Sequence, residues 1–303
     1  MRVVVTGGAG FIGANLCRTL AARGHDAVAF DDLSTGSADN IDGFEFVEGT
    51  ILDPSALDAT FAGADSVVHL AARPSVPRSI ADPVASHEVN ATGTLQVLEA
   101  VRRCGAHVVV ASSSSVYGAN PALPKSEDLV PMPMSPYAVS KLATESYAIA
   151  HAASFGVEVL VFRFFNVFGP LQPAGHAYAA VVPAFVDAAL AGRPLPVFGD
   201  GTQTRDFTFV GTVASVLTDA VERRLTDARP VNLAFGSRVS LLELAATLGS
   251  ILGRDLELDF REARTGDVRD SQADQTRLRA LFPGITPVPL EDGLRQTVEW
   301  FRS

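Results

Sequence analysis

The chain is poor in cysteine and has no long apolar segment. Its 303 residues include only Cys17 and Cys104, which lie far apart and form no CxxC pair. This spacing excludes a disulfide framework and favours a reducing compartment, the cytoplasm. No stretch approaches the roughly 18 uninterrupted apolar residues that a membrane-spanning helix needs. The apolar start of the chain stops at glycines after residue 6 and predicts a first strand, not a signal peptide.

Positive charge is also scarce. The chain has 24 Lys and Arg against 34 Asp and Glu, a formal net charge of -10 at pH 7, and no long basic run. This balance argues against binding to a nucleic-acid backbone. The histidines show no metal-ligand spacing, so no metal site is predicted; they are His25, His69, His87, His107, His151 and His176.

Short apolar runs do alternate with helical patterns through the first half of the chain. The runs are nearly continuous in valine, leucine, isoleucine and phenylalanine, which is typical of parallel strands buried on both faces. Strands are expected at residues 2–6, 27–30, 44–47, 66–70, 107–112 and 157–164, and helices at 11–23, 55–61, 83–104 and 136–155. The pattern predicts an α/β fold with a doubly wound parallel sheet.

The composition of the chain changes after Gly169. The segment "GPLQPAGHAY" is rich in residues that favour loops, and the later predicted elements are shorter. We therefore predict two domains. Residues 1–169 form the sheet domain and residues 170–303 a smaller α/β lobe, with segments around 205–237 returning to the first domain.

A glycine-rich turn joins the first strand to the first helix. In "TGGAGFIG", Gly7, Gly10 and Gly13 have the spacing GxxGxxG. Without side chains, the backbone can approach a pyrophosphate whose charge is met by the helix N-terminus. Asp31 and Asp32 end the second strand, at the distance where a ribose would lie. Because a carboxylate accepts hydrogen bonds from a ribose diol but repels a 2'-phosphate, NAD is predicted over NADP. A solvated acidic turn remains an alternative for Asp32.

Two further stretches carry candidate catalytic groups. In "SPYAVSKLATE", Tyr137 and Lys141 share one helix face, where the cation would lower the tyrosine pKa from about 10 and create an acid or base. A surface pair is the alternative. The "ASSSSVYG" run at residues 111–118 places hydroxyls at the carboxyl end of a strand, where doubly wound folds bind ligands. For Ser112 and Ser115, a hydroxyl that caps local backbone is the preferred interpretation.

The motifs TGGAGFIG, DDLSTG, HLAA, NATGT, SSSSVYG, YAVSK and RFFNVFGP occur in the order found in extended short-chain dehydrogenases. FGDGTQTRDFTFV and RTGDVRDSQAD continue the match over nearly the whole chain. The sequence resembles the NAD-dependent nucleotide-sugar epimerases and dehydratases of that class, and most of all the 4-epimerases of UDP-linked hexoses or N-acetylhexosamines. The resemblance implies NAD as cofactor, a UDP-linked sugar as substrate, and a catalytic group of Ser113, Tyr137 and Lys141.

The same resemblance implies the binding residues. Those for the cofactor are Gly7, Gly10, Phe11, Ile12, Gly13, Asp31, Asp32, Thr35, Gly36, Thr50, Ile51, Leu70, Ala71, Ala72, Asn90, Tyr137 and Lys141. Those for the substrate are Ser113, Ser114, Asn166, Arg205, Arg264 and Asp267. Thr50 stands where relatives usually have Asp, and Leu171 where Arg is frequent. Many relatives dimerise through two long helices, which here would be residues 83–104 and 136–155.

The resemblance also implies a mechanism. Tyr137 would take the proton from the sugar 4-hydroxyl while hydride leaves C4 for NAD, and Ser113 would steady the same oxygen. The 4-keto sugar would turn its other face, and hydride return would invert C4.

Alternatives within and outside the family stay open. Related dehydratases and decarboxylases carry acidic proton-transfer groups where this chain has Ser114 and Ser115, so elimination is disfavoured. UDP-glucuronate epimerases often read FTVYGP followed by an RPDM segment, whereas this chain has Asn166 and "LQPAGH", so that sugar is the weaker candidate. Ser271 falls at a position that gates 2-acetamido groups and leaves room for one. A net oxidoreductase and a non-catalytic NAD-binding module are the other possibilities.

Overall fold

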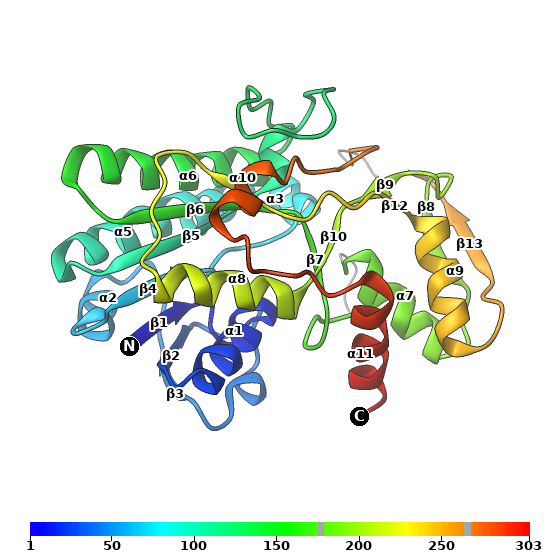
Figure 1. Ribbon diagram of the computed structural model, residues 1–303, viewed down its shortest axis with the longest axis horizontal. Coiled ribbons are helices and arrows are strands. Elements are labelled where there is room, and N and C mark those ends of the chain that lie inside the picture. Colours follow the sequence, from blue (N-terminus) through cyan, green and yellow to red (C-terminus); the bar gives the residue numbers. More distant parts are fainter. Residues whose placement is uncertain (175–178, 264–267) are drawn as a thin grey trace.

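A parallel sheet of seven strands forms the larger part of the molecule (Figure 1). The computed structural model describes residues 1–174, 179–263 and 268–303. The strand order is β11-β6-β5-β4-β1-β2-β3. The strands are β1 (Arg2–Thr6), β2 (Asp26–Asp31), β3 (Glu45–Glu48), β4 (Ser66–His69), β5 (His107–Ser113), β6 (Val159–Phe164) and β11 (Val231–Leu233). This architecture confirms the predicted doubly wound α/β fold.

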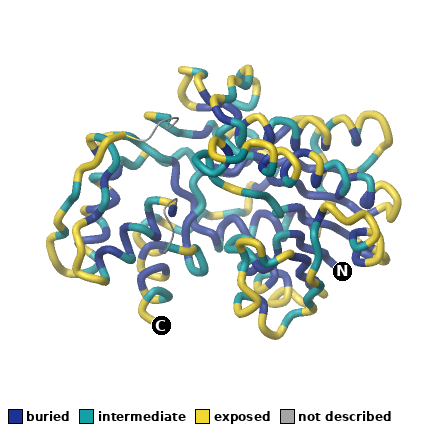
Figure 2. Tube along the Cα trace, turned by 180° about the vertical axis from the view of Figure 1, so that it is seen from behind, coloured by how far each residue is buried: buried dark blue, intermediate teal, exposed yellow. Residues whose placement is uncertain are grey.

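Helices cover both faces of this sheet, because its strands carry apolar side chains on both faces and these must be buried from water. One face packs on α1 (Phe11–Ala22), α8 (Val210–Glu222) and α10 (Thr276–Leu281). The other packs on α2 (Pro54–Phe61), α5 (Gly93–Cys104) and α6 (Pro136–Phe155). Buried residues accordingly follow the sheet strands through the middle of this part (Figure 2). None of the described helices is both long and apolar enough to cross a membrane.

The helix predicted over residues 83–104 is not uniform. It consists of α4 (Pro83–His87), a π-helical turn (Glu88–Thr92) and α5. Such turns insert an extra residue into the helix and often lie beside functional sites. Here the turn carries Asn90, whose side chain accepts a 2.7 Å hydrogen bond from the Arg73 amide and donates to the Arg73 carbonyl at 3.2 Å. The turn therefore holds the loop that follows β4.

A buried ion pair joins α6 to β6. Arg163 and Glu145 are each 3% exposed, and the guanidinium meets the carboxylate at 2.7 and 3.0 Å. The Ser112 hydroxyl adds a 2.9 Å bond to the same carboxylate, and the Tyr117 ring lies 4.8 Å from the Arg163 guanidinium carbon. Such a pair is tolerated in the interior because the remaining polar positions are also satisfied. It fixes α6 against the end of β5.

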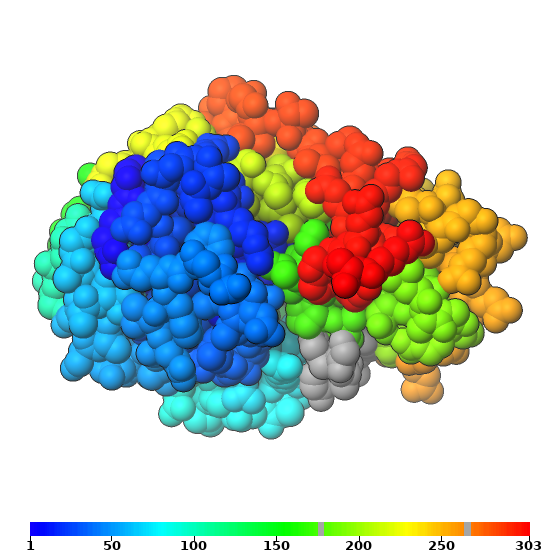
Figure 3. Space-filling view, turned by 90° about the horizontal axis from the view of Figure 1, so that it is seen from below, coloured from blue at the N-terminus to red at the C-terminus, as the bar shows by residue number. Residues whose placement is uncertain are grey.

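The remaining elements build a second, smaller part beyond the carboxyl ends of the strands. It contains α7 (Val181–Leu190), α9 (Leu241–Leu252) and α11 (Leu290–Arg302) around a separate apolar core. Three two-stranded sheets complete it: β7 (Asn166–Phe168) with β10 (Phe207–Phe209), β9 (Thr204–Arg205) with β12 (Val239–Ser240), and β8 (Leu195–Phe198) with β13 (Leu258–Arg261). Figure 3 shows the N-terminal residues (blue) and this smaller part (green, orange and red) side by side, with the C-terminal residues in red. Between β10 and β12 the chain returns to the large sheet as α8 and β11.

Candidate functional site

The turn between β1 and α1 is closed so tightly that only glycine fits it. A Cβ on Gly13 would lie 2.1 Å from the Gly7 carbonyl oxygen. Gly7 has φ +72°, and a Cβ there would lie 2.8 Å from the Ala71 amide nitrogen. Gly10 is the N-cap of α1 and has no side chain to cap the helix. The result is a cradle with the positive end of a helix at its floor, which is the chemistry that a pyrophosphate requires.

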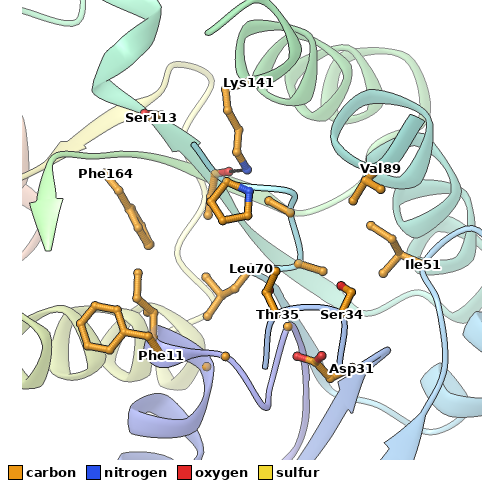
Figure 4. A pocket seen from close by; sticks show the side chains of 18 of the residues that line it. Phe11, Asp31, Ser34, Thr35, Ile51, Leu70, Val89, Ser113, Lys141 and Phe164 are labelled. Carbon is orange, nitrogen blue, oxygen red and sulfur yellow. Dashed lines mark hydrogen bonds between the residues drawn. The ribbon is translucent and has the colours of Figure 1, made fainter. Parts of the chain in front are cut away.

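This cradle opens into a cavity of about 350 Å³. Figure 4 shows Asp31 and Lys141 at opposite ends of it. The cofactor residues expected from the sequence that line it are Gly7, Gly10, Phe11, Ile12, Gly13, Asp31, Asp32, Thr35, Ile51, Leu70, Ala71, Ala72, Tyr137 and Lys141. Sequence reasoning missed several apolar or small residues of the wall: Phe30, Gly49, Pro74, Val89, Phe164, Phe165 and Val167. Most of these residues lie in, at the end of, or shortly after buried strands, and Val89 lies in a helical segment, so nothing in the sequence separates them from core residues.

Asp31 and Asp32 differ in environment. Asp31 is buried at the end of β2, where its carboxylate accepts hydrogen bonds from the amides of Ala9 (3.1 Å) and Leu33 (2.8 Å). Burial raises the pKa of this carboxyl, and the two amide bonds oppose that rise. Asp32 is exposed and accepts a bond from the Ser34 amide at 3.0 Å. The buried, oriented carboxylate of Asp31 is therefore the better ribose acceptor.

Three further residues expected at the cofactor, Gly36, Thr50 and Asn90, are not among the residues that line this cavity, and their role stays a prediction. Asn90 is 1% exposed, and its amide bonds the Arg73 backbone and the Ser140 hydroxyl. The Thr50 hydroxyl accepts a bond from the Leu52 amide at 3.3 Å. Gly36 packs on Ala9, where a Cβ would lie 2.8 Å from a backbone carbon. Each of these residues shapes a loop of the wall without lining the cavity.

The catalytic candidates meet at the other end of the cavity, where α6 begins beside the end of β5. Ser135 caps α6 by accepting a bond from the Ala138 amide at 3.2 Å, and Pro136 occupies its first turn. One turn later Lys141 is 5% exposed and donates to the Ala111 carbonyl at 2.9 Å. Burial lowers the pKa of this ammonium to about 8.

The pKa of Tyr137 departs from the sequence-based prediction. Burial raises it above the ordinary value for tyrosine, and a hydrogen bond with the Ser113 side chain opposes that rise. Lys141 does not lower the pKa of Tyr137 as expected, and burial of the phenol outweighs the opposing hydrogen bond. A phenolate at this position requires a further positive charge in the cavity, which an oxidised nicotinamide ring supplies.

A histidine lies directly behind this group but is held neutral. His69 is 2% exposed and bonds the hydroxyls of Thr6 (2.8 Å) and Thr94 (3.0 Å). Burial, with a smaller contribution from the Lys141 charge, lowers its pKa to about 3. His69 is therefore a structural member of the core and no general acid.

A second cavity of about 660 Å³ adjoins the first and extends into the smaller part. Tyr137 lines both cavities. Asn166 and Arg205 line the second one as the sequence suggests, and Arg193 and Arg261 line it in addition. The Arg205 guanidinium is anchored by the carbonyls of Thr204 (2.9 Å) and Arg269 (3.0 Å). Guanidinium groups suit a diphosphate. The expected ligands Arg264 and Asp267 lie outside the described residues.

The wall that carries Arg205 is organised by Asp206, which is fully buried. Its carboxylate accepts bonds from the amides of Gly236, Ser237 and Ala273 and from the Ser237 hydroxyl, all between 2.9 and 3.1 Å. These bonds tie the β9–β10 segment to two loops that are distant in sequence. No local spacing in the sequence announces this arrangement.

Comparisons with known proteins agree with this geometry. The family model described as "NAD dependent epimerase/dehydratase family" matches residues 3–234. The UDP-glucose 4-epimerase of Mycolicibacterium smegmatis is 41% identical over 313 aligned positions, which cover 100% of this chain and 99% of that protein. The solved UDP-N-acetylglucosamine 4-epimerase of Methanobrevibacter ruminantium, in complex with UDP-N-acetylmuramic acid, has a TM-score of 0.94 at 33% identity, covering 99% of this chain and 98% of that one. Thermus thermophilus UDP-glucose 4-epimerase in complex with NAD has a TM-score of 0.91 at 34% identity, covering 100% and 99%.

Proposed function

Because this chain belongs to the NAD-dependent epimerase/dehydratase family, we propose that it is a UDP-sugar 4-epimerase that uses NAD. One observation carries the proposal. Tyr137 lines both the cavity with the pyrophosphate cradle and the second cavity lined by arginines, and Ser113 lies beside it in the first. A dinucleotide and a nucleotide sugar can therefore approach the same phenol from two sides.

The residues of the first cavity fit NAD. The closed glycine turn would hold the pyrophosphate, Asp31 the adenosine ribose, and Lys141 the nicotinamide ribose. When bound, NAD takes up a hydride from the sugar and gives it back, so that the reaction has no net redox change.

The chain supplies the proton transfer. Tyr137 as phenolate removes the proton from the 4-hydroxyl, and the Ser113 side chain, already bonded to Tyr137, shares the developing charge on that oxygen. After the keto sugar has turned, Tyr137 returns the proton to the same oxygen and C4 is inverted. Residues 170–303 would form the nucleotide-sugar lobe. Arg205, Arg264 and Asp267 of this lobe, with Asn166 from just before it, would bind the nucleotide and hold the sugar loosely enough to turn.

Dehydration is the less favoured reaction. Elimination across C5 and C6 needs an acid and a base beside the catalytic hydroxyl, and the neighbouring positions hold Ser114 and Ser115. A net oxidoreductase would use the same catalytic group but would release reduced cofactor.

Turnover of a panel of UDP- and dTDP-linked hexoses, N-acetylhexosamines and hexuronates tests the function. We expect a C4-inverted product from at least one UDP-sugar, with almost no NADH accumulating during turnover. Product stereochemistry from NMR and absorbance of NADH check both expectations. Stoichiometric NADH release would assign the chain to the oxidoreductases instead, and no conversion of any sugar would reject catalysis.

A homodimer through α4, α5 and α6 is also proposed. Exposed apolar side chains lie on these helices, namely Val84, Val139 and Tyr147, at 67%, 53% and 41% exposure. We expect the wild type to have twice the 31.9 kDa chain mass by light scattering and Tyr147→Glu to shift the mass toward one chain. Phe260→Glu, a change at an equally apolar exposed site in the other part, should leave the mass unchanged. A monomeric wild type would contradict the proposal.

A cytoplasmic location is the corresponding proposal for the compartment. Cys17 and Cys104 are both free thiols in the structure, and neither has a disulfide partner within the described chain.

A further inference from the structure

A third cavity, of about 240 Å³, lies beside the catalytic serine. Ser113, Ser114 and Ser115 line it from the end of β5 and the 3₁₀ turn that follows (Ser114–Tyr117). Lys125, from the loop before α6, lines the same cavity. Since Ser113 belongs to both the first and the third cavity, a sugar whose C4 oxygen bonds Ser113 can place a neighbouring ring substituent here.

Lys125 is a buried cation that forms no ion pair with any of the residues the structure describes. The side chain is 4% exposed, and its ammonium donates to the Asn120 carbonyl. No carboxylate of the described residues forms an ion pair with it, and burial lowers its pKa. Lysine is seldom buried unpaired, because removing the charge from water is costly. The cavity therefore offers a site where an anion would relieve that cost.

The backbone of Lys125 is firmly placed. Its amide donates to the Gln272 carbonyl at 2.7 Å, and its carbonyl accepts bonds from the Asp274 amide at 2.9 Å and the Asn232 side chain at 2.7 Å. These hydrogen bonds fix the position of the Lys125 Cα, from which the side chain extends. A preorganised cation contributes more to recognition than one on a mobile loop.

A second observation points to a ligand at the same cavity. The Ser115 hydroxyl is buried and has no hydrogen-bond partner in the structure. Buried hydroxyls are nearly always satisfied, and an unsatisfied one is unfavourable. This hydroxyl can donate to an anionic oxygen that enters the cavity.

Among the described residues, the other charges that line the cavity do not cancel that of Lys125. Asp270 lines it, but its carboxylate accepts the Thr204 hydroxyl at 2.5 Å and pairs with Arg238 at 3.5 Å. Arg205 lines the cavity as well. With Asp270 matched by Arg238, Lys125 is the charge among the described residues that a bound group would meet.

We propose that this cavity accepts an acidic substituent next to the reacting carbon, so that the preferred substrate is a UDP-hexuronate, with Lys125 as the residue that selects the carboxylate. In a hexuronate the carboxylate stands on C5, one bond from the C4 whose oxygen Ser113 holds. The inference rests on the proposed epimerase function and narrows its substrate. The sequence motifs alone disfavour a hexuronate, but Lys125 lies outside every motif quoted above, so they carry no information on this residue.

Rates with UDP-glucuronate and UDP-glucose test this assignment. We expect the wild type to have a kcat/KM for UDP-glucuronate at least tenfold above that for UDP-glucose. Lys125→Met keeps the length of the side chain but removes the charge, and it should lower that ratio by roughly 10- to 100-fold. Lys125→Arg keeps the charge and should retain most of the ratio. A wild type that prefers UDP-glucose, or a ratio that Lys125→Met leaves unchanged, would overturn the proposal.

Binding provides a readout that does not depend on turnover. In a Tyr137→Phe background, the Kd for UDP-glucuronate should rise at least tenfold on Lys125→Met, while bound NAD and the thermal midpoint stay the same. If no sugar of the full panel is epimerised, the proposed function fails. The change in Kd then still tests whether Lys125 binds the carboxylate. Equal binding of UDP-glucuronate with and without Lys125→Met would reject that role.

Discussion

Replacing Tyr137 by phenylalanine should lower kcat by roughly 10²- to 10⁴-fold, the range that a general acid or base contributes. The ring still fills its place between the two cavities, whereas the oxygen that exchanges the proton is gone. Because the glycine cradle and Asp31 lie at the far end of the first cavity, NAD should remain bound (Figure 4). Steady-state rates, together with the NAD content of the purified variant, measure the two effects separately.

A matched control lies on the same helix. Tyr147 is 41% exposed on α6, and Tyr147→Phe removes a hydroxyl of the same kind away from both cavities. This variant should keep kcat within about twofold, as surface substitutions usually do. If Tyr137→Phe were as active as Tyr147→Phe, the phenol would not be the proton carrier, and another group would have to take its place.

The tyrosine also explains why cofactor and catalysis are coupled. Burial raises the pKa of Tyr137, and Lys141 points its ammonium at the Ala111 carbonyl. The phenolate is therefore disfavoured in the chain alone and becomes accessible when positive charge enters the first cavity. Such a tyrosine would act as a base mainly while oxidised NAD is present. Proton removal from the sugar would then occur in the same state of the enzyme that can accept the hydride.

The fold was accessible from the sequence because its signals are local. Continuous apolar runs such as Arg2–Thr6 mark strands buried on both faces, and the glycine turn and the Tyr137–Lys141 spacing each lie within one short segment. The π-helical turn at Glu88–Thr92 was not foreseen, because it does not change the apolar pattern of the helix. The pKa direction of Tyr137 was also wrong, since spacing gives proximity but says nothing of desolvation.

The rest of the site depends on tertiary contacts. Arg193 and Arg261 come from different elements of the smaller part and meet only in the second cavity. Phe164 and Val167 are apolar residues at the end of and just beyond a buried strand, so in the sequence they look the same as core. Lys125 shows the same limit most clearly, because a lysine in a loop is normally exposed and its burial is visible only in the folded chain.

Gly13→Ala should abolish measurable NAD binding or weaken it by at least 100-fold. Alanine would ordinarily favour a helix by about 1 kcal/mol relative to glycine. Here the new methyl group would lie 2.1 Å from the Gly7 carbonyl oxygen and 2.8 Å from the Gly8 Cα, both of them backbone atoms. Gly7 cannot easily yield, because its amide donates to the Phe30 carbonyl at 2.8 Å. The overlap therefore outweighs the helix propensity, and α1 must move away from the turn.

Titration of NAD by fluorescence and thermal unfolding distinguish the consequences of that movement. Overpacking of this kind costs about 1–3 kcal/mol or more, so a lower unfolding midpoint should accompany the lost affinity. Gly284→Ala is the matched control, because a Cβ at that position meets nothing within 4 Å, and it should change neither quantity. Unchanged NAD affinity in Gly13→Ala would mean that the pyrophosphate does not rest on this turn. The proposal that NAD approaches Tyr137 from the first cavity would then fail. Asp31 and Lys141 could bind the two riboses, but no group would hold the pyrophosphate between them.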